Sequence, residues 1–204
     1  MGFDIKRVGV IGAGQMGSGI AHVCSLAGYD VSLNDTSTER IQTGLATVNG
    51  NMTRQVNKGH ITDAERIAGL ARIQPAVNLD ALAECDIVIE AATENEQVKR
   101  KIFQQLCPVL KPETLLATNT SSISITRLAA STDRPEKFVG VHFMNPVPLM
   151  QLVELVRGIA TDDHTFDLCK KFVARLGKVS TVAEDFPAFI VNRILLPMIN
   201  EAIY

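Results

Sequence analysis

The chain has 204 residues, of which 46% are hydrophobic and 21% are charged, and its formal net charge is −2. So small a charge argues against nucleic-acid binding through bulk electrostatics, and no apolar run is long enough to span a membrane. Residues 1–7 are too few and too polar for a signal peptide, and the four scattered cysteines lack metal-ligand spacing. We therefore expect a cytoplasmic protein with no metal site.

The segment from Val8 to Ala21 is a β-branched run that passes through three glycines into a helix-forming sequence. Gly12, Gly14 and Gly17 have the G-x-G-x-x-G spacing. The first glycine permits a tight turn, the second lets a pyrophosphate approach the main chain, and the third lets the helix pack close to the strand. The pattern predicts a dinucleotide site at a helix N-terminus, with a glycine-rich turn that binds nothing as the alternative.

A second strand at residues 30–34 ends on Asp35, 18 residues after Gly17. A carboxylate at this distance typically binds the ribose hydroxyls of an adenine dinucleotide. No basic residue follows until Arg40, which leaves nothing nearby to hold a ribose 2′-phosphate. This arrangement favours NAD over NADP, although Asp35 is also a good turn or helix-capping residue.

Residues 36–39 have the pattern of a capping box, which predicts a helix from there to about Lys58. Arg54 and Lys58 lie four residues apart and so share one face of this helix. They form either a solvated basic edge or an anchor for an anionic ligand. A second capping box at residues 62–65 opens a short helix, and a strand is expected near residues 70–74.

The most apolar strand, at residues 86–92, is expected deep in a parallel sheet. Ala91, at its carboxyl end, is small and leaves room for a ligand to lie across it. Ligands of open α/β sheets sit beyond the carboxyl ends of the strands, which makes Glu94 and Lys99 candidates for the site. A helix-start carboxylate and a surface lysine are the alternative interpretations.

Another strand, at residues 115–118, leads into the polar run 119–122. We expect one of the serines Ser121 and Ser122 to cap a helix from about Ile123 to Ala130, and the other to face the cleft. A further strand follows at residues 138–142. The alternation of strand and helix up to this point predicts a doubly wound, Rossmann-type α/β fold with a mostly parallel sheet.

Two prolines separate the strand that ends on His142 from an apolar run that contains Glu154. If the two strands fold back around Pro148, His142 and Glu154 lie six residues from that centre on either side and can face each other. A buried carboxylate needs a partner, and a carboxylate also orients an imidazole. The pair predicts an acid–base dyad for hydride-transfer chemistry, with a structural His–Glu pair as the alternative.

The last part of the sequence, from Phe186 onward, reads as a long apolar helix. Its regularly spaced apolar side chains would form an uncovered face. We expect that face to meet another domain or another chain.

Five segments together resemble the L-3-hydroxyacyl-CoA dehydrogenases, and most closely the bacterial 3-hydroxybutyryl-CoA dehydrogenases: residues 12–21, 90–92, 119–122, 142–148 and 189–193. The resemblance covers the whole chain. It implies NAD-dependent interconversion of a 3-hydroxyacyl-CoA thioester and its 3-ketoacyl-CoA, in fatty acid and butanoate metabolism. It further implies a homodimer formed through a C-terminal helical region.

The resemblance also implies roles for individual residues. His142 would be the general base and Glu154 its orienting carboxylate, while Ser121 and Asn192 would bind the reacting oxygen of the substrate. Arg54 and Lys58 match positions that meet the phosphates of coenzyme A. The cofactor positions would be Gly12, Ala13, Gly14, Gln15, Met16, Gly17, Asp35, Ala91, Glu94, Lys99, Ser121 and Asn145.

We accordingly divide the chain into an NAD-binding domain, residues 1–186, and the first helix of a truncated all-α domain, residues 187–204. Two further interpretations stay open. One is a sugar-acid dehydrogenase of the L-gulonate type, and the other is an NAD-binding fragment without turnover.

Overall fold

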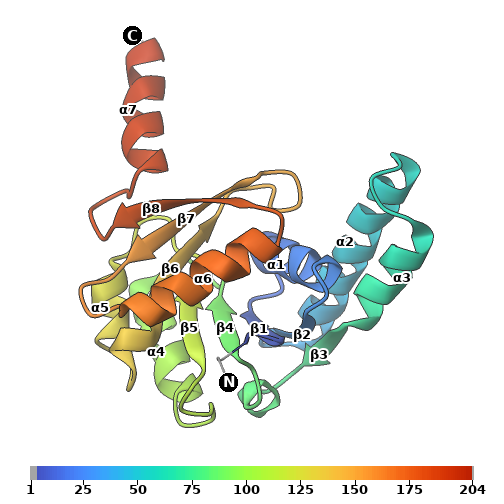
Figure 1. Ribbon diagram of the computed structural model, residues 1–204, viewed down its shortest axis with the longest axis horizontal. Helices are drawn as coiled ribbons and strands as arrows, with labels where there is room; N and C mark the ends of the chain where they lie inside the picture. The colour runs from blue at the N-terminus through green and yellow to red at the C-terminus, as the bar shows by residue number, and fades with distance from the viewer. Residues whose placement is uncertain (1–3, 204) are drawn as a thin grey trace.

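The computed structural model describes residues 4–203, which form a single eight-stranded sheet with helices on both faces (Figure 1). The spatial strand order is β3-β2-β1-β4-β5-β6-β7-β8, and neighbours are parallel except for the antiparallel pair β6–β7. This arrangement confirms the predicted mostly parallel, doubly wound fold. The strands are β1 (Arg7–Ile11), β2 (Asp30–Asn34), β3 (Ile73–Ala76), β4 (Ile87–Glu90), β5 (Leu115–Thr118), β6 (Phe138–Phe143), β7 (Leu152–Arg157) and β8 (Val179–Glu184).

Alternate side chains of the strands pack on two separate hydrophobic cores, one on each face of the sheet. In β4, for example, Ile87 and Ile89 belong to one core and Val88 to the other. The first core is covered by α1, α2 and α6, and the second by α4 and α5. The helices are α1 (Gln15–Leu26), α2 (Thr38–Asn57), α3 (Asp63–Ala71), α4 (Glu96–Leu106), α5 (Ile125–Ala129), α6 (Asp163–Arg175) and α7 (Val191–Ile203), with 3-10 turns η1 (Leu79–Leu82) and η2 (Pro135–Lys137).

The strand order reverses between β1 and β4, because β1 leads outward to β2 on one side while β4 leads to β5 on the other. Two parallel strands whose connections diverge leave a crevice beyond their carboxyl ends. The Gly-rich turn after β1 and the turn after β4 form the walls of this crevice. The fold therefore places the predicted dinucleotide motif at the switch point of the sheet.

Several helix starts differ from those predicted. The N-cap of α2 is Ser37, whose side chain accepts the N–H of Arg40, whereas the expected capping box at residues 62–65 is present. The N-cap of α5 is Ser124, and neither of the two expected serines has this role, because α5 begins only at Ile125. Glu94 accepts the main-chain N–H groups of Ser121 and Ser122 instead. The strand expected at residues 70–74 begins later, since residues 70 and 71 still belong to α3.

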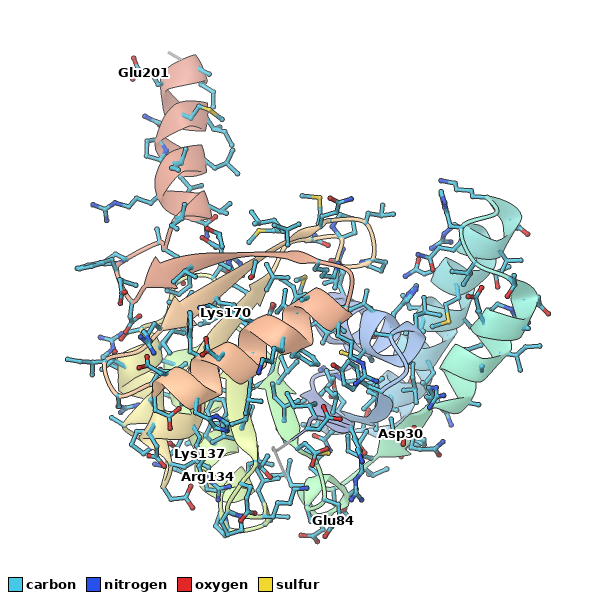
Figure 2. The ribbon with its side chains drawn as sticks, in the orientation of Figure 1. Asp30, Glu84, Arg134, Lys137, Lys170 and Glu201 are labelled. Atoms are coloured by element: carbon cyan, nitrogen blue, oxygen red, sulfur yellow. The ribbon has the colours of Figure 1, made fainter. Side chains whose placement is uncertain are left out.

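The last helix, α7, projects away from the body of the molecule (Figure 1), and none of its residues is buried. It begins at Val191 and not at Phe186, because Ala188 and Phe189 have positive φ angles of 67° and 50° that no helix accommodates. Figure 2 places Glu201 near the free end of α7, far from Asp30 and Glu84 at the opposite side of the molecule. Among the helices of residues 4–203, none is long and apolar enough to cross a membrane.

Candidate active site

The glycines of the Gly-rich turn meet different surroundings, and these fit the three roles that the spacing predicts. Gly12 has a φ of 101°, and a Cβ there would lie 2.7 Å from the carbonyl oxygen of Ala91. A Cβ on Gly17 would lie 1.7 Å from the carbonyl oxygen of Gly12. A Cβ on Gly14 would meet nothing within 4 Å. The turn is therefore tightly packed at Gly12 and Gly17 and open at Gly14, where a pyrophosphate could approach the N-terminus of α1.

A pocket extends from this turn along the carboxyl ends of β1, β2 and β4, and residues predicted to bind the cofactor line it: Gly12, Gly14, Gln15, Met16, Asp35 and Ala91. Asp35 lies at its far end and accepts the main-chain N–H of Ala13 at 2.8 Å. Its second oxygen accepts the N–H of Thr36 at 2.7 Å. Asp35 thus braces the Gly-rich turn in addition to facing the pocket.

Arg40 also lines this pocket, which corrects the inference that no basic residue lies near Asp35. Its guanidinium is 3.8 Å from Asp35 Oδ1. Sequence distance alone was misleading, because α2 starts at Thr38 and its first turn brings Arg40 back over the end of β2.

His142 and Glu154 face each other across the antiparallel pair β6–β7, in the register that folding back around Pro148 predicts. His142 Nδ1 lies 2.7 Å from Glu154 Oε2, and both side chains are buried. Because a carboxylate can only accept, Nδ1 carries the proton and the lone pair of the neutral ring is on Nε2. The ring of Phe189 packs edge-on against the imidazole, with centroids 6.1 Å apart.

The other carboxylate oxygen of Glu154 accepts hydrogen bonds from the main chain at the start of the last helix. Oε1 accepts the main-chain N–H groups of Ile190 at 2.9 Å and Val191 at 2.8 Å. Burial of Glu154 acts to raise the pKa of its carboxyl, but the hydrogen bonds from His142 and from these two N–H groups outweigh it and lower the pKa below its ordinary value. Glu154 is therefore a buried, charged group that accepts three hydrogen bonds from the protein.

The segment that follows His142 is tied back to the Gly-rich turn. Asn145 Oδ1 accepts a hydrogen bond of 3.1 Å from Gln15 Nε2, so two predicted cofactor residues from distant parts of the sequence meet. Farther along, the ammonium of Lys178 donates to the carbonyl oxygens of Val147 and Met150, both at 2.7 Å. These contacts fix the loop that carries Asn145 beside the pocket.

Ser121 and Asn192 are brought together between β5 and α7. Asn192 Nδ2 donates to the carbonyl oxygen of Ser121 at 3.3 Å. Glu94 Oε1 accepts the N–H of Ser121 at 3.0 Å and the Oγ–H of Thr120 at 2.6 Å. The predicted residues Glu94, Ser121 and Asn192 are thus one connected group at the carboxyl edge of the sheet, on the side of β4 toward the dyad.

Lys99 lies behind this group and does not line the pocket. Its side chain is 1% exposed, and its ammonium is 2.8 Å from each carboxylate oxygen of Glu90, which is 0% exposed. Arg54 and Lys58 lie exposed near the C-terminal end of α2, outside the pocket as well. In residues 4–203 no cluster of three or more acidic, histidine or cysteine side chains is arranged to hold a metal ion.

Neither the role of Glu90 as a buried hydrogen-bond acceptor nor the packing of Phe189 against His142 was predicted from the sequence. Glu90 Oε2 accepts from Thr118 Oγ1 at 2.7 Å and Oε1 accepts from the N–H of Ala92 at 2.7 Å. A charged residue at the end of an otherwise apolar strand was an available signal, because a buried carboxylate needs several donors. The position of Phe189 had no such signal, since it depends on two residues with positive φ.

The comparisons with known proteins agree with this geometry. Residues 7–186 match the family model described as the NAD-binding domain of 3-hydroxyacyl-CoA dehydrogenase. The chain is 68% identical to the 3-hydroxybutyryl-CoA dehydrogenase of Bradyrhizobium diazoefficiens, over 98% of this chain and 68% of that relative. It is 41% identical to the 3-hydroxyadipyl-CoA dehydrogenase of Escherichia coli, over 99% of this chain and 42% of that relative.

A solved structure shows the same likeness. The (S)-3-hydroxybutyryl-CoA dehydrogenase of Ralstonia eutropha superimposes with a TM-score of 0.96 at 47% identity, over 98% of this chain and 70% of that one. Both the fold and the NAD prediction are confirmed by these matches. The chain therefore belongs to the 3-hydroxyacyl-CoA dehydrogenase family, and its residues 7–186 are the NAD-binding domain of a close homologue of 3-hydroxybutyryl-CoA dehydrogenase.

Proposed function

We propose that this protein interconverts (S)-3-hydroxybutyryl-CoA and acetoacetyl-CoA with NAD, and that His142 is its acid–base catalyst. The observation that carries the proposal is the buried 2.7 Å contact between His142 and Glu154. His142 lies three residues before Asn145, and Asn145 contacts Gln15, which belongs to the Gly-rich turn. A proton-handling group beside a dinucleotide site is what alcohol oxidation requires.

The chain's residues fit the cofactor. The open space above Gly14 admits a pyrophosphate, the N–H groups of the first turn of α1 point toward it, and Asp35 lies where ribose hydroxyls need an acceptor. When bound, NAD accepts the hydride from the carbon that bears the substrate hydroxyl.

The proton follows a separate path through the dyad. His142 Nε2 takes the hydroxyl proton as the carbonyl forms, and Glu154 stabilises the resulting imidazolium through Nδ1. In the reverse direction the same nitrogen returns the proton to the ketone oxygen. We propose that Ser121 and Asn192, which contact each other, donate hydrogen bonds to that oxygen and hold it beside His142.

The coenzyme A part of the substrate is assigned to the basic edge of α2. Arg54 and Lys58 lie on one exposed face, and phosphates bind well to such a pair. Preference for the four-carbon acyl group rests on the 68% identity to a 3-hydroxybutyryl-CoA dehydrogenase, compared with 41% to a 3-hydroxyadipyl-CoA dehydrogenase.

The division at residue 186 and the homodimer also remain proposals. The exposed apolar side chains of α7 support both, because a helix with such a face is stable when another surface covers it. They are Ile194, Leu195, Leu196, Met198, Ile199 and Ile203. Light scattering on the chain, alone and joined to the C-terminal segment of the Bradyrhizobium relative, would measure the assembly; a monomer in both forms would exclude the dimer.

The test of function is the oxidation of NADH, followed by absorbance, with acetoacetyl-CoA as substrate and the same two protein forms. Loss of NADH in either form supports the proposal. L-gulonate with NAD is the comparison substrate, and turnover of it in place of the thioester would favour the sugar-acid reaction. NADH binding without turnover of either substrate in both forms would show a non-catalytic NAD-binding protein.

A further inference from the structure

Asp185, the first residue after β8, binds the start of a helix that lies far from it in the sequence. Its Oδ2 accepts the Oγ–H of Ser124 at 2.7 Å and the main-chain N–H of Thr126 at 2.8 Å, and its Oδ1 accepts the N–H of Ile125 at 2.9 Å. The two N–H groups are among those that the first turn of a helix leaves without an intrahelical partner. Asp185 is therefore a cap of α5 that comes from 59 to 61 residues farther along the chain.

Helix α5 also has a cap of its own. Ser124 Oγ accepts the main-chain N–H of Arg127 at 3.2 Å, which is the usual contact of an N-cap serine. Packing holds the helix on the sheet as well, since Ile125 is buried and a Cβ on Gly140 of β6 would lie 2.8 Å from Ile125 Cδ1. A helix held in these two ways has less need of a distant cap for its own formation, which points to a different use of Asp185.

The contacts of Asp185 complete a closed ring that contains two of the proposed substrate residues. Ser121 lies three residues before Ser124, and Asn192 lies seven residues after Asp185. Asn192 Nδ2 closes the ring by donating to the carbonyl oxygen of Ser121 at 3.3 Å. That hydrogen bond is slightly longer than the usual range and is weak on its own, so the contacts at Asp185 are needed to keep the two segments together.

The segment between Asp185 and Asn192 is itself fixed at both ends. Asp185 follows directly on β8, which pairs in register with β7. Just before Asn192, two main-chain N–H groups are held by Glu154, the carboxylate of the dyad. The turn that carries Ser121 is held from two sides, at its start by Glu94 and at its end by Asp185. Asp185 is therefore the group that joins this turn to the strands of the dyad.

We propose that Asp185 is a positioning residue: it ties the turn that carries Ser121 to β8, so that Ser121 and Asn192 meet the reacting oxygen of the substrate together. The inference rests on the proposed function, because it gives the ring a purpose through these two residues. Asp185 does not line the cofactor pocket. A small displacement of the turn weakens a hydrogen bond that is made in the transition state, so loss of Asp185 should lower kcat and leave binding of the remote coenzyme A part unchanged.

The first experiment observes the ring without using activity. In the ¹⁵N-labelled 204-residue chain, the side-chain amide signal of Asn192 reports its hydrogen bond to Ser121, and the signal of the exposed Asn57 is the internal reference. We expect the Asn192 signal to shift toward that of Asn57 in Asp185→Ala, and to shift less in Asp185→Asn, which keeps one acceptor oxygen. Ser124→Ala is the matched control, because it removes the helix's own cap and leaves both main-chain contacts of Asp185, so the signal should not move.

The second experiment measures turnover of acetoacetyl-CoA per NADH-binding site, in the form of the protein that is active. Counting binding sites removes any loss of folded protein from the comparison. We expect kcat to fall about tenfold in Asp185→Ala and about threefold in Asp185→Asn, while KM for the thioester and Kd for NADH change less than about twofold. Ser124→Ala should keep kcat within about twofold of the unmodified protein.

An Asn192 signal that stays in place in Asp185→Ala would overturn the inference. A kcat per site equal to that of Ser124→Ala would overturn it as well, because a residue needed only for folding changes the number of sites and not their rate. If Asp185→Ala does not fold, Asp185→Asn decides between the same outcomes. If the unmodified protein turns over no acyl-CoA in either form, the proposed function fails, and the amide signal then decides whether Asp185 holds Ser121 against Asn192.

Discussion

Glu154 lies directly opposite His142 in the antiparallel ladder of β6 and β7, and the same carboxylate accepts the first main-chain N–H of α7. Both contacts depend on the tertiary structure, since His142 and Glu154 are 12 residues apart and Val191 is 37 residues beyond Glu154. The site is therefore assembled by the ladder and by the turn before α7, and each can be tested separately.

Replacement of His142 by alanine should reduce turnover of acetoacetyl-CoA at least about 100-fold, because no other described group beside Glu154 is placed to exchange the proton. Binding of NADH, measured by its fluorescence, should change less than about threefold, a difference of under 1 kcal/mol. His164→Ala is the matched control, since His164 is exposed on α6. Full turnover by His142→Ala would show that another group exchanges the proton.

The lowered pKa of Glu154 links stability to pH. A carboxyl whose folded-state pKa lies below its ordinary 4.5 contributes stability above that value, and the contribution is lost as the pH falls through the folded-state pKa. Glu154→Gln should therefore be less stable than the unmodified protein at about pH 7, and the difference should shrink below about pH 4.5. Urea denaturation at both pH values measures it.

Glu201→Gln is the control for this comparison, because Glu201 is exposed near the free end of α7 (Figure 2). Its stability should match that of the unmodified protein at both pH values. A difference between Glu154→Gln and the unmodified protein that stays constant with pH would contradict the linkage.

Two glycine substitutions should separate binding from folding. Gly14→Ala places a methyl group in open space above the turn, so the protein should fold normally and lose at least about tenfold in affinity for NADH. Gly17→Ala drives a methyl group into the carbonyl of Gly12 and should cost about 3 kcal/mol or more of stability. Thermal unfolding and NADH titration of both variants make the comparison, and equal affinities for NADH in Gly14→Ala and the unmodified protein would place the pyrophosphate elsewhere.

Asp35→Ala should weaken NADH binding about tenfold and raise the relative affinity for NADPH. The physical reason is the guanidinium of Arg40, which lies 3.8 Å from the Asp35 carboxylate and would be free to meet a 2′-phosphate. Asp30→Ala, at the exposed start of β2, the strand that ends just before Asp35, is the control. An unchanged ratio of NADPH to NADH affinity would show that Arg40 does not reach the ribose.

The sequence was most informative where a local pattern has one physical meaning. The glycine spacing predicted the turn after β1, and the fold-back around Pro148 predicted the register that pairs His142 with Glu154. It was least informative where the outcome depends on tertiary contacts. The proximity of Arg40 to Asp35 comes from the place where α2 begins, and the start of α7 is set by the left-handed backbone at Ala188 and by the carboxylate of Glu154.

The antiparallel pairing of β6 and β7 also dictates which changes of length the chain can tolerate. Successive side chains of a strand point to opposite faces, so one residue removed within β7 ahead of Glu154 would turn that carboxylate toward the core under α1 and α6. The imidazole would then face Leu155, which would take the place of Glu154 opposite His142. Residues 144–151, which connect the two strands, carry no such parity, although Asn145, Val147 and Met150 make the contacts that fix this loop. Insertions and deletions should therefore be absent from the two strands and, within the connection, should spare these three positions.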